Sequence, residues 1–156
     1  MKIIFSIVTL IILAIVIYFF VLGVISKSAE APGIAHGKLT ACPNKPNCVS
    51  SEAGEDDAYS IASLLLENIS VEKAMAQLEV IINTSGAEIV KVEENYIAAT
   101  YTSSIFRFVD DLEIRLDVDN KTIHFRSASR VGHSDFGVNR KRVEELKKAF
   151  IQTQSN

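Results

Sequence analysis

Residues 111–126 read Asp-Leu-Glu-Ile-Arg-Leu-Asp-Val-Asp-Asn-Lys-Thr-Ile-His-Phe-Arg, and this stretch decides the fold. Apolar and charged side chains alternate on both sides of a central Asp-Asn turn, which predicts a β-hairpin with one buried face. A loop of two residues would place Glu113 opposite Arg126. A loop of four would instead place Asp111 opposite Arg130. Either register pairs opposite charges across the strands, so both stay open.

A second hairpin is predicted upstream, because residues 90–101 alternate in the same way around a turn at 94–95. Its apolar face is expected to contain Val90, Val92, Ile97, Ala99 and Tyr101. Apolar residues at the spacing of one helix face then predict a helix between Ser70, its cap, and Gly86, its end. A last helix begins at about Val138. The sequence therefore predicts an α+β domain in which two helices cover one face of a four-stranded antiparallel sheet.

The N-terminus carries the longest apolar run of the chain. Residues 3–26 contain no charge and have a lysine on either side, a length with which a helix can cross a bilayer. The run exceeds the core of a signal peptide, which spans about 7 to 15 residues, so residues 1–27 are expected to form an uncleaved transmembrane anchor. A cleaved signal is the alternative, since residues 29–31 resemble a peptidase site, although Pro32 would hinder cleavage there.

Cys42 and Cys48 bracket a short Pro-Asn-Lys-Pro-Asn stretch, which favours a disulfide-closed loop. Such a bridge persists outside the cytoplasm, so the domain is expected on the extracytoplasmic side of the membrane. The lysines that follow the anchor favour the opposite orientation by the positive-inside rule, but the cysteines decide the expectation. Two free thiols in a cytosolic loop are the alternative. A metal site would need more ligands than His36 and the two cysteines, so neither a metal nor another cofactor is expected.

The rest of the chain divides into two parts by composition. Residues 28–57 are rich in Pro, Gly and Ser and are interpreted as a linker with the cysteine loop. The acidic residues near its end are Glu52, Glu55, Asp56 and Asp57. Residues 58–152 are expected to hold the single α+β domain, which is too small for two cores.

A charged run at residues 126–140 supplies most of the candidate site. The candidates for a ligand site or a structural charge network are Asp110, Asp111, Glu113, Arg126, Ser129, Arg130, Asp135, Asn139 and Arg140. Three arginines could converge with free amides at the start of the last helix to bind a small anion. The same arginines could instead be neutralised by the carboxylates in a network that joins strands to helix. If the network is structural, the bases of the last helix are expected to form a solvated face, namely Arg140, Lys141, Arg142, Lys147 and Lys148.

Catalysis has weaker support than binding. Asp111 and Glu113 share a strand face and could act as acid and base, but pairing with arginine is the favoured explanation. Ser129 with His133 and Asp135 lacks the nucleophile elbow of serine hydrolases, so no catalytic residue is assigned. Nucleic acid is not expected as a partner, because the net charge is −3 and the basic stretch has no interleaved aromatics.

Three motifs together resemble a known family. They are Cys-Pro-Asn-Lys-Pro-Asn-Cys-Val-Ser-Ser at 42–51, Phe-Val-Asp-Asp-Leu-Glu at 108–113, and the run at 126–140. In this order they resemble the family catalogued as domain of unknown function 1499, over residues 39–150. The chain departs from the family pattern at 61–66, where a proline-containing stretch would be usual. The resemblance implies a bacterial or plastid protein that is exported or membrane-attached, with no established activity.

These observations lead to one expectation of function. The chain is expected to be a single-pass protein of the bacterial inner membrane, held through residues 3–26, with its soluble domain on the extracytoplasmic side. That domain is expected to bind a protein partner or a small anionic ligand without catalysing a reaction. The alternatives are an envelope hydrolase or transferase that uses Asp111 and Glu113, and a structural subunit of a membrane complex.

Overall fold

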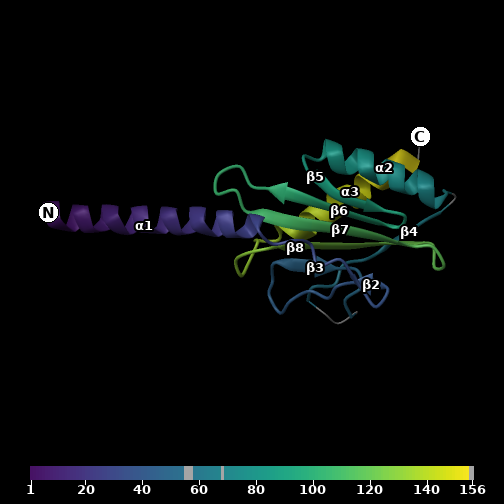
Figure 1. Cartoon of the computed structure of the whole chain (residues 1–156), viewed down its shortest axis with the longest axis horizontal. Helices are drawn as coiled ribbons and strands as arrows, with labels where there is room; N and C mark the ends of the chain where they lie inside the picture. The colour runs from purple at the N-terminus through teal and green to yellow at the C-terminus, as the bar shows by residue number, and fades with distance from the viewer. Residues whose placement is uncertain (55–57, 68, 155–156) are drawn as a thin grey trace.

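A 26-residue helix, α1 (Lys2–Lys27), stands away from the rest of the chain in the computed structural model, which describes residues 1–54, 58–67 and 69–154 (Figure 1). Among the helices described, α1 alone is long and apolar enough to cross a membrane. The remaining elements are β1 (Ile34–Ala35), β2 (Lys38–Leu39), β3 (Cys48–Ser50), β4 (Leu64–Leu65), α2 (Val71–Thr84), β5 (Glu88–Glu93), β6 (Tyr96–Thr102), β7 (Val109–Asp117), β8 (Thr122–Ser129) and α3 (Val138–Gln154).

The main sheet has six strands in the described residues, not the four that were expected. The two predicted hairpins form β5 to β8, and the order across the sheet is β3-β8-β7-β6-β5, with β4 also paired to β8. All of these pairings are antiparallel. The outer edge of β8 would leave backbone groups unpaired in a four-stranded sheet, and β3 and β4 satisfy them. A separate two-stranded sheet joins β1 to β2.

The register of the β7–β8 hairpin places Glu113 opposite Arg126, as the two-residue alternative expects. The β5–β6 hairpin turns tightly as expected, but the register shifts between Ile89 and Lys91. This bulge moves Ile89 against the core and leaves Val90 54% exposed. The expectation that Val90 lies on the buried face is therefore wrong, because a bulge changes which side chains face inward. Val92, expected on the same face, is also 47% exposed and lies outside the core.

The helices α2 and α3 cover one face of the sheet, as predicted (Figure 1). Ser70 caps α2, since its hydroxyl oxygen accepts a hydrogen bond from the Lys73 amide at 3.3 Å. Gly86 follows the helix with φ of 87°, a backbone conformation that glycine adopts without strain. The fully buried side chains of this core include Leu78, Ile82, Ile97, Leu112, Ile114, Phe125, Val143 and Phe150.

The second face of the sheet is covered by the chain that follows α1. Leu39 packs there against Tyr96 and Ala98, and all three side chains are buried. Cys42 and Cys48 form the expected disulfide, with Cα atoms 5.7 Å apart, and Cys48 is the first residue of β3 at the sheet edge. The segment after α1 is thus held to the sheet by strand pairing, a covalent loop and apolar packing. Residues 55–57 of the acidic cluster lie outside the described residues.

Candidate functional site

The sheet divides the candidate residues between its two faces. Neighbouring residues of a strand point to opposite sides, so Asp110 faces α3 while Asp111 faces the segment that follows α1. The second face carries Asp111, Glu113, Arg126 and Arg130. The helix face carries Asp110, Ser129 and Asn139. The geometry therefore makes two polar clusters rather than one site.

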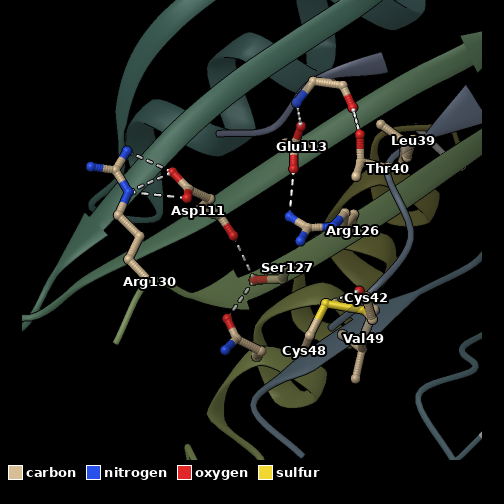
Figure 2. Close-up of polar contacts among 12 residues, drawn as sticks. Leu39, Thr40, Cys42, Cys48, Val49, Asp111, Glu113, Arg126, Ser127 and Arg130 are labelled. Atoms are coloured by element: carbon tan, nitrogen blue, oxygen red, sulfur yellow. Dashed lines mark hydrogen bonds and ion pairs between the residues drawn. A yellow bond between two sulfur atoms is a disulfide. The ribbon is translucent and has the colours of Figure 1, made fainter. Parts of the chain in front are cut away.

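Glu113 is the centre of the second-face cluster and is fully buried. Its Oε2 lies 2.6 Å from Arg126 Nη1, across the β7–β8 pair. Its Oε1 accepts hydrogen bonds from the Tyr96 hydroxyl and the Gly33 amide, each at 2.8 Å. Figure 2 shows this carboxylate between the Arg126 side chain and a backbone amide. One carboxylate thus ties β6, β7 and β8 to the segment after α1.

The environment of Glu113 fixes the protonation of its neighbour. Burial raises the pKa of Tyr96, and the charge of Glu113 and its hydrogen bond raise it further. Tyr96 therefore stays a neutral phenol that donates to the carboxylate. Within the described part of the chain Arg126 forms no ion pair except the one with Glu113, and its buried Nε finds no hydrogen-bond partner there. The neutrality of the cluster depends on Glu113 alone.

Asp111 and Arg130 form the second ion pair of this face. Arg130 Nη2 lies 2.7 Å from Asp111 Oδ1, and Arg130 Nε donates to both carboxylate oxygens at 3.0 Å (Figure 2). The Arg130 side chain is 9% exposed and the Asp111 side chain 5%. Arg130 Nη1 also donates to the Ser26 carbonyl at 3.2 Å. This pair therefore joins the sheet to the last turn of α1.

The helix-face cluster is built around Asn139, which is fully buried. Its side-chain amide donates to the Asn47 carbonyl and the Ser129 hydroxyl, each at 3.1 Å, and its Oδ1 accepts from Ser127 at 2.6 Å. These contacts brace the start of α3 against β8 and the loop that precedes β3. Asn139 therefore occupies a structural position between three segments.

Of the remaining candidates, Asp135 touches the helix-face cluster through the Asn139 amide, whereas Arg140 lies apart from both clusters. The Asp135 carboxylate accepts hydrogen bonds from the Gly137 and Asn139 amides at 3.0 and 2.7 Å, so it takes up amides at the start of α3. Arg140 donates to the backbone carbonyls of Ser60 and Ala58 at 2.9 and 3.1 Å. The three arginines of the expected anion site, Arg126, Arg130 and Arg140, do not converge.

Two arginines missed in the sequence complete the networks. Arg142 was expected to face solvent, but it lies 2.9 Å from Asp110 and its guanidinium stacks 4.1 Å from the Tyr101 ring centre. Its spacing of three from Asn139 is the signal that puts both on one helix face. Arg115 lies 2.7 Å from Glu52, whose side chain is 4% exposed. No sequence pattern links Glu52 to β7.

A cleft of about 800 Å³ opens on the second face beside Arg130. It lies between the segment after α1 and the strands β5 and β6. Its charged lining residues are Lys27, Glu30, Glu88, Lys91, Arg107 and Arg130. Lys91 pairs with Glu93 at 2.8 Å, and Arg130 pairs with Asp111. Lys27 and Arg107 are exposed and form no ion pair with another described residue. These two cations are available to a ligand, and so are the Glu30 and Glu88 carboxylates of the same lining.

The described residues hold no group of three or more His, Cys, Asp or Glu side chains placed to share a metal ion. The carboxylates of Asp111 and Glu113 are engaged by arginines, and that of Asp135 accepts from backbone amides. The geometry of this region supports charge pairing and hydrogen bonding, with the cleft as the place where a further molecule can enter.

Comparison with known proteins places residues 38–150 in a family. The matching family model is described as "Protein of unknown function (DUF1499)". The matched residues include the disulfide loop, the six-stranded sheet with both ion pairs of its second face, all of α2 and most of α3. No curated protein matches the chain.

Proposed function

The chain belongs to the DUF1499 family, and from this premise we propose that it is a single-pass membrane protein whose folded domain binds a small anionic ligand without catalysing a reaction. The observation that carries the proposal is the cleft next to the end of α1. Lys27 and Arg107 line it without forming an ion pair with another described residue, and they stand beside Arg130 and Lys91 against two acidic lining residues, Glu30 and Glu88. Anions are held by such charge-assisted contacts.

The proposed location is the extracytoplasmic side of a bacterial inner membrane. Two features support it: α1 has the length and apolarity of a membrane span, and a disulfide joins Cys42 to Cys48. Disulfides persist in oxidising compartments and are rare in the cytosol. In intact cells, a membrane-impermeant maleimide should label a cysteine introduced at Val118, on the exposed β7–β8 turn. Labelling only after lysis would place the domain inside.

The competing enzymatic hypothesis, which uses Asp111 and Glu113, has less support. Each carboxylate is held by an arginine, and Glu113 is fully buried with two further donors. A general acid or base needs reach to a substrate proton. Here that reach would require breaking a buried ion pair. The geometry therefore supports binding in the cleft more strongly than chemistry at the carboxylates.

The binding proposal can be tested by titration calorimetry on the full chain in detergent micelles. The probes are dihexanoyl phosphatidylglycerol, dihexanoyl phosphatidylcholine and free glycerol 1-phosphate. We expect the anionic lipid to bind, and Lys27→Ala with Arg107→Ala to weaken it about tenfold or more, since each tenfold corresponds to about 1.4 kcal/mol. Binding of glycerol 1-phosphate alone would identify a soluble anion instead of a lipid head group.

A matched variant controls for the loss of two positive charges. Lys141→Ala with Lys148→Ala removes two bases of α3, away from the cleft, and leaves the net charge equal to that of the cleft variant. It should bind as the unmodified chain does. Equal binding by the cleft variant and by this control, or no binding of any anionic probe, would refute the proposal.

A further inference from the structure

The last turns of α1 pack directly on the domain. The rings of Phe19 and Phe20 lie 5.2 and 5.4 Å from the ring of Phe106, between β6 and β7. Phe108 lies 6.2 Å from Phe19 and continues the same aromatic cluster. In Figure 1 the helix enters at the end of the sheet where β6 passes into β7. The helix and the β6–β7 connection therefore share one apolar contact.

Polar contacts fix this joint. The Val109 amide donates to the Ser26 hydroxyl oxygen at 3.1 Å, and Ser26 is fully buried. Gly23 is also buried, and a Cβ atom there would lie 1.8 Å from the Phe106 carbonyl oxygen. Only a glycine permits this approach of helix to loop. The β6–β7 connection is thus held at the level of residues 19–26 of α1.

That level lies inside the apolar run of the chain. A helix rises about 1.5 Å per residue, and a hydrocarbon core of about 30 Å takes about 20 residues. A span that begins at Ile3 therefore ends at about residue 22. Phe19 and Phe20 then lie just inside the hydrocarbon core, next to the head groups. Because Phe106 contacts both, the β6–β7 connection must reach the same depth.

The connections at this end of the domain expose large apolar side chains. Ile105 is 68% exposed, and Phe136, between β8 and α3, is 97% exposed. The two connections are neighbours, since Asp110 pairs with Ser129 and the Arg130 amide donates to the Val109 carbonyl at 3.2 Å. Figure 1 shows both at the end from which α1 projects.

The backbone at Phe136 strengthens the case for a function at this position. Its φ is 55°, a left-handed conformation that bulky residues adopt rarely and at an energetic cost. No described side chain covers its ring. The ring of Phe136 is wholly apolar, so contact with the acyl region would remove its exposed surface from water and be favourable. A lipid surface would cover Phe136 and Ile105 together.

We propose that residues 103–108 and 130–137 enter the lipid boundary of the leaflet from which α1 emerges, so that the domain rests on the membrane surface through two loops. The inference depends on the proposed insertion of α1 and adds a second contact with the same bilayer. Its occupant is a phospholipid surface. Arg107 and Lys27, both exposed beside these loops, would lie at the level of the lipid head groups.

Tryptophan scanning tests the proposal, because the chain contains no Trp and every introduced indole is the only one present. The test variants are Ile105→Trp and Phe136→Trp in the full chain, reconstituted in phospholipid vesicles whose acyl chains are brominated near the head group. Val118→Trp, on the β7–β8 turn at the opposite end of the sheet, is the matched control. Ile12→Trp, at the middle of the proposed span, reports insertion of the helix in parallel vesicles whose acyl chains are brominated near their methyl ends.

We expect both loop variants to lose most of their emission in brominated vesicles and to emit at shorter wavelength than Val118→Trp, which should keep its emission. If Ile12→Trp is quenched but both loop variants behave like Val118→Trp, the loop contact is wrong and the anchor stands. If Ile12→Trp is not quenched either, the membrane assignment and the loop contact both fail. Quenching of Val118→Trp to the same extent as the loops would also refute the proposed orientation.

Discussion

Replacement of Glu113 by glutamine is the sharpest perturbation that the structure offers. Glutamine keeps the shape and one acceptor oxygen, so the hydrogen bonds from Tyr96 and Gly33 can persist. The other oxygen becomes an amide group that faces Arg126 Nη1, now 2.6 Å from a donor. Arg126 is left as a buried cation, with its side chain 6% exposed and no anion beside it.

The expected cost of Glu113→Gln is about 3 to 5 kcal/mol, the range found when one partner of a buried ion pair is removed. A domain of this size is typically stable by about 5 to 15 kcal/mol, so this variant should lose much of its resistance to urea. Pulse proteolysis across a urea series measures the loss on the full chain in micelles. It reports unfolding of the domain, independently of α1.

The exposed pair of Lys91 and Glu93 provides a matched control. Its atoms are 2.8 Å apart, but its side chains are 57% and 54% exposed. Glu93→Gln should therefore cost about 1 kcal/mol or less. The contrast between the two Glu→Gln variants isolates burial, because the chemical change is the same and both pairs are close.

A double variant tests whether the unpaired cation causes the loss. Glu113→Gln with Arg126→Met removes both charges, and apolar replacement of a buried pair is often neutral or stabilising. We expect the double variant to recover most of the stability lost in Glu113→Gln. A Glu113→Gln variant as stable as Glu93→Gln, or a double variant less stable than Glu113→Gln, would refute the reasoning.

Three further predictions follow from separate contacts. Cys42→Ser with Cys48→Ser should lower the free energy of unfolding by about 2 kcal/mol, because the closed loop is short, and unchanged urea resistance would contradict this. Burial lowers the pKa of His124 below its ordinary 6.5, so the unfolded chain binds the proton more tightly than the folded chain does. The free energy of unfolding should therefore be highest above pH 6.5 and fall as the pH drops through that value. His124→Gln should flatten this pH profile. Gly23→Val should force α1 away from Phe106, so the Val109 amide would lose its hydrogen bond to the Ser26 hydroxyl. Amide hydrogen exchange at Val109 should then be faster. Exchange as slow as in the unmodified chain would show that the joint tolerates the side chain.

The parts of the fold that follow from periodicity could be predicted. The alternation around residues 111–126 gave both a hairpin and its charge pairing, and the spacing after Ser70 gave α2 with its cap. The strand β3 could not be predicted in this way, because all three of its residues are buried and show no alternation. The bulge at Ile89 was also invisible, since it depends on packing at the sheet edge.

The candidate site was predicted in its members more than in its arrangement. The two registers were treated as alternatives, yet Glu113–Arg126 and Asp111–Arg130 both form. The second pair forms because Arg130 lies beyond the end of β8 and its long side chain reaches diagonally to β7. Gly33 donates to Glu113 over a separation of 80 residues, and a single sequence carries no signal for such a contact.

The joint between α1 and the sheet has a mechanical consequence. Ser26 and Gly23 are packed against the β6–β7 connection, so no flexible linker separates α1 from the domain at this point. The 26 residues of α1 make a lever about 39 Å long, at about 1.5 Å per residue. A transmembrane helix tilts when its apolar stretch is longer than the hydrocarbon thickness of the bilayer. With α1 in a bilayer, as proposed, the rigid joint would tilt the whole domain by the same angle as the helix, and the bilayer thickness would set the direction in which the cleft opens.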